Sequence, residues 1–93
     1  MNHWQLSLTI HGHVQGVNFR SYAREKARTL RLVGWVRNEE EGTVGILAQG
    51  SKEILVEFLE WCTVGPRWAK VEKVEEGWKE IEKLEFERFE IRF

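Results

Sequence analysis

The sequence predicts an α+β fold in which two helices cover one face of an antiparallel sheet. Several stretches alternate apolar and polar residues, which is the period of a strand with one buried face. Two other stretches repeat apolar residues every three or four positions, which is the period of a helix. The stretches follow one another in the order β-α-β-β-α-β, which is a split β-α-β arrangement.

The first strand is predicted to end near His11 and the first helix to begin at Phe19 or Arg20. Apolar residues occupy alternate positions of the strand, at Trp4, Leu6, Leu8 and Ile10. Gly12 and Gly16 permit a tight turn between the two elements. The apolar side of the helix is expected to consist of Phe19, Tyr22, Ala23, Ala27 and Leu30.

A hairpin, a second helix and two further strands are predicted after residue 32. Residues 33–38 and 43–50 are rich in β-formers, and the sequence Glu-Glu-Glu-Gly joins them. Ser51 is a suitable N-cap for a helix that ends before Gly65 and Pro66. Its apolar positions are Ile54, Leu55, Phe58, Leu59 and Cys62. Residues 68–78 suggest a fourth strand, and a last strand is expected from about residue 84, with an irregularity near Arg88. This order is that of the ferredoxin-like folds.

The composition fits one domain over residues 1–93. The chain has 42% apolar residues and a formal net charge of −1, and that charge argues against general nucleic-acid binding. It contains no apolar run of membrane-spanning length and no signal-peptide pattern, so we expect a soluble cytoplasmic protein. Cys62 cannot form an internal disulfide and is expected to be a buried thiol. The acidic residues are all Glu, a bias that leans toward a heat-adapted source.

The stretch GHVQGVNFR, residues 12–20, predicts an anion site. Its glycines allow a tight turn into a helix, so that successive main-chain N–H groups can point into one concavity. Arg20 adds a planar guanidinium, which matches two phosphate oxygens. A cation at a helix N-terminus is otherwise unfavourable, and a bound oxyanion would compensate for it. The alternative is that Arg20 merely begins a solvated helix face.

Two motifs resemble the signatures of a known family. GHVQGVNFR and GWVRN, residues 34–38, are similar to the G-x-V-Q-G-V-x-F-R and G-W-V-x-N signatures of the acylphosphatases, small ferredoxin-like hydrolases of carboxyl-phosphate anhydrides. The resemblance extends over the whole chain. It implies catalytic roles for Arg20 and Asn38, the latter otherwise an ordinary turn residue. It also implies a phosphate-binding loop made of Gln15, Gly16, Val17, Asn18, Phe19 and Arg20.

The resemblance further implies a chemistry. The protein would hydrolyse acyl phosphates to carboxylate and phosphate, with Arg20 and the loop amides binding the phosphoryl group and Asn38 orienting the attacking water. A carboxamide can position water without titrating. Phosphoryl transfer depends mainly on positioning and charge stabilisation, so neither metal nor cofactor is expected. The expected partner is the small-molecule substrate, with no nucleic acid and no membrane, and the expected state is a monomer.

Two features of the sequence depart from the family pattern, the hairpin after Asn38 and the residue that follows the first helix. The hairpin reads Glu39-Glu40-Glu41-Gly42 where the family commonly has L-P-D-G, and its three carboxylates either repel an anionic substrate or point to solvent. Arg31 stands where the family usually has glycine, which predicts strain or a shifted helix end there.

Other readings of the sequence remain open. His11 and His13 offer only two ligands, and His3 is too far along the strand to join them, so a metal site is disfavoured, while His13 could assist phosphate binding. Tryptophans among basic residues could indicate an RNA-binding module, although Trp4 and Trp35 are expected in the core. A third possibility is a domain that binds phosphate without turnover.

Overall fold

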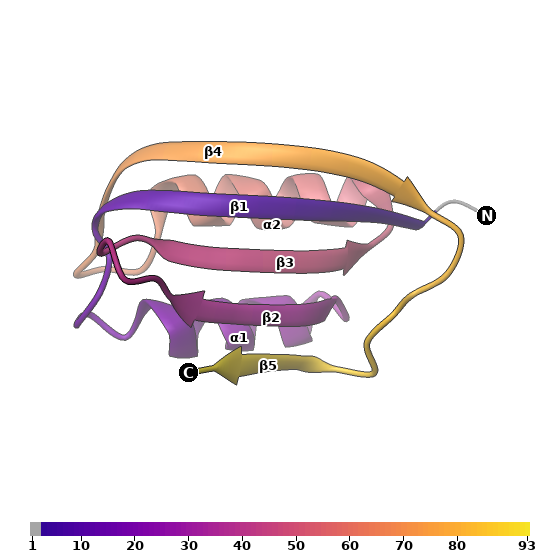
Figure 1. Cartoon of the computed structure of the whole chain (residues 1–93), viewed down its shortest axis with the longest axis horizontal. Coiled ribbons are helices and arrows are strands. Elements are labelled where there is room, and N and C mark those ends of the chain that lie inside the picture. Colours follow the sequence, from indigo (N-terminus) through magenta and orange to yellow (C-terminus); the bar gives the residue numbers. More distant parts are fainter. Residues whose placement is uncertain (1–2) are drawn as a thin grey trace.

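The computed structural model describes residues 3–93, so that the first two residues of the expected domain lie outside the described part. A five-stranded sheet is covered on one face by two helices (Figure 1). In chain order the elements are β1 (His3–His13), α1 (Phe19–Thr29), β2 (Val33–Asn38), β3 (Val44–Gly50), α2 (Lys52–Val64), β4 (Lys70–Ile81) and β5 (Phe89–Arg92).

The sheet is mixed, and the expectation of a purely antiparallel sheet is wrong at one edge. The strand order is β4-β1-β3-β2-β5, and the β1–β3, β1–β4 and β2–β3 pairs are antiparallel. β5 instead pairs with β2 in parallel. After β4, residues 82–88 run along the end of the sheet to its far edge, and β5 then follows the direction of β2 (Figure 1). The ferredoxin-like α+β class is confirmed.

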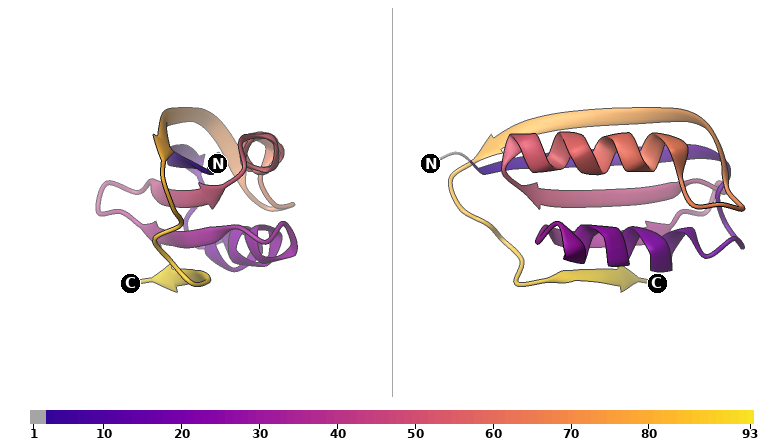
Figure 2. Two further views of the ribbon diagram at one scale, coloured as in Figure 1. Left: turned by 90° about the vertical axis from the view of Figure 1, so that its right-hand side faces the viewer. Right: turned by 180° about the vertical axis from the view of Figure 1, so that it is seen from behind.

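The core lies between the sheet and the two helices, which Figure 2 shows from behind. The helix-facing side chains of the central strands are buried, and they pack against the apolar sides of α1 and α2. The main members are Leu6, Leu8, Ile10, Val36, Val44, Ile46, Ala48, Phe19, Ala23, Ala27, Leu55, Phe58, Cys62 and Phe89. The apolar stripes predicted for both helices are confirmed except at Tyr22, which is 48% exposed.

Trp35 lies on the other face of the sheet, so its expected place in the core is wrong. Its neighbour Val36 is fully buried toward the helices, and side chains alternate along a strand. The half-buried Trp35 ring contacts two arginines, with guanidinium carbons 4.6 Å (Arg37) and 5.3 Å (Arg92) from the ring centroid. Trp4, by contrast, packs against the core.

β1 extends two residues beyond its predicted end. The pairing with β4 shifts register between His11 and Gly12, which marks a β-bulge. Gly12 has φ 128°, and a Cβ there would collide with the carbonyl oxygen of Lys70. The bulge therefore lets β1 continue to His13, directly before the loop that carries the predicted site.

The boundaries of the later elements differ most near the C-terminal end. β4 runs to Ile81 rather than to residue 78, and β5 begins at Phe89 rather than near residue 84. The predicted irregularity corresponds to the connection through residues 82–88, where the Arg88 carbonyl accepts a hydrogen bond from the Gly34 amide at 3.1 Å.

Two local expectations are confirmed. Ser51 caps α2, because its hydroxyl accepts a hydrogen bond from the Ile54 amide at 3.4 Å. Arg31 adopts φ 61°, a left-handed conformation that is strained for a residue with a side chain.

Candidate functional site

The site loop, residues 14–18, connects β1 to the N-terminus of α1. Val14 anchors its start in the core, and Phe19 anchors the first turn of α1. Between them Gly16 (φ 78°) and Asn18 (φ 63°) both adopt left-handed conformations. Such turns into a helix can direct main-chain N–H groups toward one side. Asn18 makes no side-chain cap and the first turn holds no acidic residue, so the amides there remain available to a ligand.

Arg20 carries a positive charge in the first turn of α1. The half-buried side chain lies over the Phe93 ring, with 5.0 Å between the guanidinium carbon and the ring centroid. Within residues 3–93, the ion pairs include no carboxylate partner for Arg20. Because the helix dipole also disfavours a cation at this end, an anion bound beside Arg20 would be stabilised by both the guanidinium and the helix N-terminus.

Asn38 lies at the end of β2 and shares a pocket with Arg20. The pocket has a volume of about 200 Å³ and includes both side chains in its wall. Its lining consists of Val14, Gly16, Asn18, Phe19, Arg20, Ser21, Asn38, Ile91 and Phe93. The C-terminal ends of β1, β2 and β5 all lie at the same side of the molecule (Figure 1). Two motifs that are separate in the sequence therefore meet at one cavity.

Two of the predicted phosphate-binding residues lie outside this pocket. The Gln15 side chain donates hydrogen bonds to the main-chain oxygens of Glu39 and Thr43, both at 2.9 Å. Val17 is half-buried and packs against the core. Both side chains thus hold the site loop in place rather than facing the cavity.

Four pocket residues were absent from the predicted set. Val14 and Ser21 flank the predicted loop, so their positions in the sequence could have suggested them. Ile91 belongs to β5 and Phe93 directly follows it, and the parallel pairing of β5 with β2 brings both beside Asn38. An antiparallel sheet would not have put them there.

The acidic hairpin does not enter the pocket. Glu40 and Glu41 are exposed, whereas the carboxylate of Glu39 accepts a hydrogen bond from the Arg37 guanidinium at 3.1 Å. None of the three glutamates lines the cavity. The interpretation that these carboxylates point to solvent fits Glu40 and Glu41, whereas Glu39 is half-buried and paired with Arg37.

The remaining candidate side chains lie elsewhere or have other partners. Burial raises the pKa of the Cys62 thiol, which keeps it protonated in the core. His11 lies 2.9 Å from a carboxylate oxygen of Glu75, and this hydrogen bond, with the nearby charge of Lys73, lowers the pKa of Glu75. Among the described residues no three His, Cys, Asp or Glu side chains are grouped to hold a metal ion.

Comparison with known proteins identifies the family. The family model for acylphosphatase matches residues 6–91. The chain belongs to the acylphosphatase family. An acylphosphatase of Pelotomaculum thermopropionicum is 37% identical over 93 residues, the whole of both chains. One from Salinibacter ruber is 42% identical over 88 residues, which are 95% of this chain and 92% of that relative.

Solved structures of acylphosphatases have the same fold. The crystal structure of the Bacillus subtilis acylphosphatase aligns with a TM-score of 0.90 and 34% identity, over 97% of this chain and 99% of that one. The resemblance seen in the sequence is confirmed, and so is the hydrolase class. Family membership favours the hydrolase interpretation over the alternative of an RNA-binding module. Within residues 3–93, no helix combines the length and apolar character needed to cross a membrane.

Proposed function

We propose that the pocket between the site loop and the ends of β2 and β5 hydrolyses acyl phosphates, with Arg20 and Asn38 as its catalytic residues. The observation that carries the proposal is that a guanidinium with no carboxylate partner among residues 3–93, a helix N-terminus and a carboxamide surround one cavity. Membership of the acylphosphatase family supports the reaction class.

Arg20 and the amides of the site loop and first turn bind the phosphoryl group. A guanidinium can donate two parallel hydrogen bonds to phosphate oxygens, and the helix N-terminus adds further donors. The predicted binding set keeps Gly16, Asn18, Phe19 and Arg20, which line the cavity. These donors are in position before the substrate arrives, so they stabilise charge that shifts onto the phosphoryl oxygens during the reaction.

Asn38 orients the attacking water. Within the described residues its side chain makes no hydrogen bond that would commit it elsewhere, and it borders the same cavity as Arg20. Its carbonyl oxygen can accept a hydrogen bond from water while the amide group donates to another oxygen. The water attacks phosphorus, the bond from phosphorus to the bridging oxygen breaks, and the carboxylate leaves with that electron pair.

Substitution of the two catalytic residues tests the proposal. Arg20→Ala and Asn38→Ala should each lower the rate of benzoyl phosphate hydrolysis, followed by ultraviolet absorbance, by about 10²–10³-fold, the usual loss for one positioned donor. Arg24→Ala is the matched control, because this arginine of α1 does not line the pocket. Wild-type rates in either catalytic variant would refute the assignment. Binding of inorganic phosphate without turnover by the unaltered protein would identify a non-catalytic phosphate-binding domain.

We also propose that residues 1–93 act as one domain, as a monomer in the cytoplasm, without metal or cofactor. The metal-free mechanism is supported by Arg20 and the α1 N-terminus, which supply the positive potential that a divalent cation would otherwise provide. Turnover should therefore persist in a chelator. A rate that falls with chelation and returns with added Mg²⁺ would contradict this part of the proposal.

A further inference from the structure

The pocket has an apolar side formed by β5 and the residue that follows it, Phe93. Of its apolar lining residues, Val14 and Phe19 are 1% exposed and belong to the core. Ile91 is half-buried and Phe93 is 99% exposed, so these two are the apolar side chains that reach the opening of the cavity. The polar groups of the lining come from the site loop, α1 and Asn38. The cavity therefore has a polar side and an apolar side.

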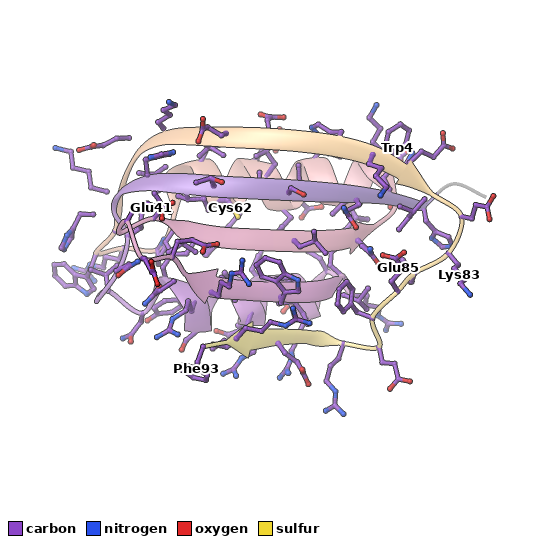
Figure 3. All side chains as sticks on the ribbon, in the orientation of Figure 1. Trp4, Glu41, Cys62, Lys83, Glu85 and Phe93 are labelled. Atoms are coloured by element: carbon purple, nitrogen blue, oxygen red, sulfur yellow. The ribbon has the colours of Figure 1, made fainter. Side chains whose placement is uncertain are left out.

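The parallel pairing of β5 with β2 puts Phe93 beside both catalytic residues. Val36 pairs with Ile91 and Arg37 pairs with Arg92, so Phe93 follows β5 at the level of Asn38. Figure 3 shows Phe93 at the end of β5. Its ring centroid lies 5.0 Å from the guanidinium carbon of Arg20. A phosphoryl group held by Arg20 therefore lies close to this ring.

The chemistry of an acyl phosphate brings its acyl group to the apolar side. A single bridging oxygen separates the acyl carbon from phosphorus, so a substituent on that carbon extends only a few bonds from the bound phosphoryl group. Loop amides and Arg20 occupy the polar side. An apolar or aromatic acyl group gains by covering an exposed ring and Ile91, whereas an acetyl group is too small to cover much of either.

We propose that Ile91 and Phe93 form the acyl-binding side of the pocket and favour substrates with an aromatic or extended apolar acyl group over acetyl phosphate. This inference rests on the proposed function and deepens it. Phe93 is then a specificity-determining residue rather than a catalytic one, because the reacting phosphorus and water are held by Arg20, the loop and Asn38.

The test compares kcat/KM for benzoyl phosphate and acetyl phosphate in variants of Phe93. Phe93→Ala should lower the ratio of the two values by about tenfold, the size of discrimination that a small apolar contact provides. Phe93→Tyr, which keeps the ring, should retain the wild-type ratio. Trp68→Ala is the matched control, since Trp68 is 70% exposed and lies outside the pocket. The inhibition constant of inorganic phosphate should stay unchanged in all three variants.

The outcomes separate the alternatives. An unchanged ratio in Phe93→Ala, with the wild type active, overturns the acyl-binding role and leaves the proposed function intact. Equal losses for both substrates together with weaker inhibition by phosphate also overturn it, because Phe93 would then act by holding Arg20. If the wild type hydrolyses neither substrate, the proposed function fails and this inference fails with it.

Discussion

Gln15 connects the site loop to the hairpin between β2 and β3. Its side-chain amide donates to the carbonyl oxygens of Glu39 and Thr43, and these flank the hairpin directly after Asn38. The two carbonyls also accept main-chain hydrogen bonds from Gly42 and Glu39, respectively, so they are not left without partners if Gln15 is lost. This cross-link fixes the site loop, which leads into α1 and Arg20, relative to the strand that carries Asn38.

Substitution of Gln15 should therefore reduce both stability and activity. Gln15→Ala removes two donors, and we expect it to lower the free energy of unfolding by about 1–3 kcal/mol. Gln15→Glu should be worse than Ala at neutral pH, because a carboxylate would face two carbonyl oxygens and donate to neither. Denaturant unfolding measures the free energy of unfolding of the two Gln15 variants. His13→Ala, at an exposed position, is the control. A glutamate variant as stable as the alanine variant would contradict the two-donor role.

At the scale of residues, the motifs predicted the residues on the polar side of the pocket. They did not predict the contacts that hold these residues in place. Arg20 and Asn38 each stand in a short motif, so local sequence was sufficient to select them. The partners of Gln15 lie 24 and 28 residues further along the chain, and no local pattern identifies them. Phe93 reaches Arg20 only through the pairing of β5 with β2. Contacts set by tertiary structure are what the sequence could not predict.

Among the elements, α1 ends in a motif that would ordinarily contain glycine. The Leu32 amide donates to the Ala27 carbonyl at 2.9 Å and the Arg31 amide to the Arg28 carbonyl at 3.0 Å, the two hydrogen bonds of a Schellman motif. Arg31 occupies its left-handed position, with φ 61°. The helix end is thus not shifted, and the backbone of Arg31 instead adopts a strained left-handed conformation.

Arg31→Gly should stabilise the protein. Glycine relieves a left-handed strain of about 1–2 kcal/mol, but it also gains freedom in the unfolded chain, so we expect a net increase of about 0.5–1 kcal/mol in the free energy of unfolding. Arg24→Gly, in the interior of α1, should instead destabilise by about 1 kcal/mol. Thermal and denaturant unfolding compare the two variants. A destabilised Arg31→Gly variant would show that the arginine side chain outweighs the strain.

The elements were predictable where one period dominated. Residues 33–38 and the starts of both helices were predicted correctly, since alternation or a three-to-four spacing extends through them. Ile81, Leu84 and Phe86 fit neither period cleanly, and the last strand was predicted to begin near residue 84, five residues too early. The actual course of residues 82–88 is set by a long-range contact with β3.

For the molecule as a whole, Gln49 links the C-terminal part of the chain to the centre of the sheet. It is fully buried on β3, and its side chain donates to Gln5 at 2.8 Å and to the Glu85 carboxylate at 3.0 Å. Its oxygen accepts a hydrogen bond from the Glu85 amide at 2.8 Å. Glu85 lies in the segment that crosses the end of the sheet, away from the candidate site (Figure 3).

This link bears on the site because it determines where β5 lies. The segment through Glu85 leads directly into β5, and β5 with the following Phe93 supplies the apolar side of the pocket. If Gln49 loses its three hydrogen bonds, the edge strand is still held by its parallel pairing with β2, by the buried Phe89 side chain and by the hydrogen bond from the Arg28 guanidinium to the Phe89 carbonyl oxygen. A substitution far from the cavity should therefore loosen its apolar side.

Gln49→Leu tests this coupling. Leucine has a side chain of similar size but no polar group, so the Glu85 amide loses its acceptor. We therefore expect a loss of about 1–3 kcal/mol in the free energy of unfolding. The effect should be local, so hydrogen exchange should accelerate at the amides of β5 and of Gly34, which bonds to Arg88, more than in β1 and β3. Glu87→Ala, an exposed change in the same segment, should alter neither quantity. Equal acceleration of exchange in every strand would mean that Gln49 stabilises the sheet as one unit. Faster exchange in β5 alone, together with a lower ratio of kcat/KM for benzoyl phosphate to that for acetyl phosphate, would show that a hydrogen-bond network at the opposite end of the sheet influences substrate preference.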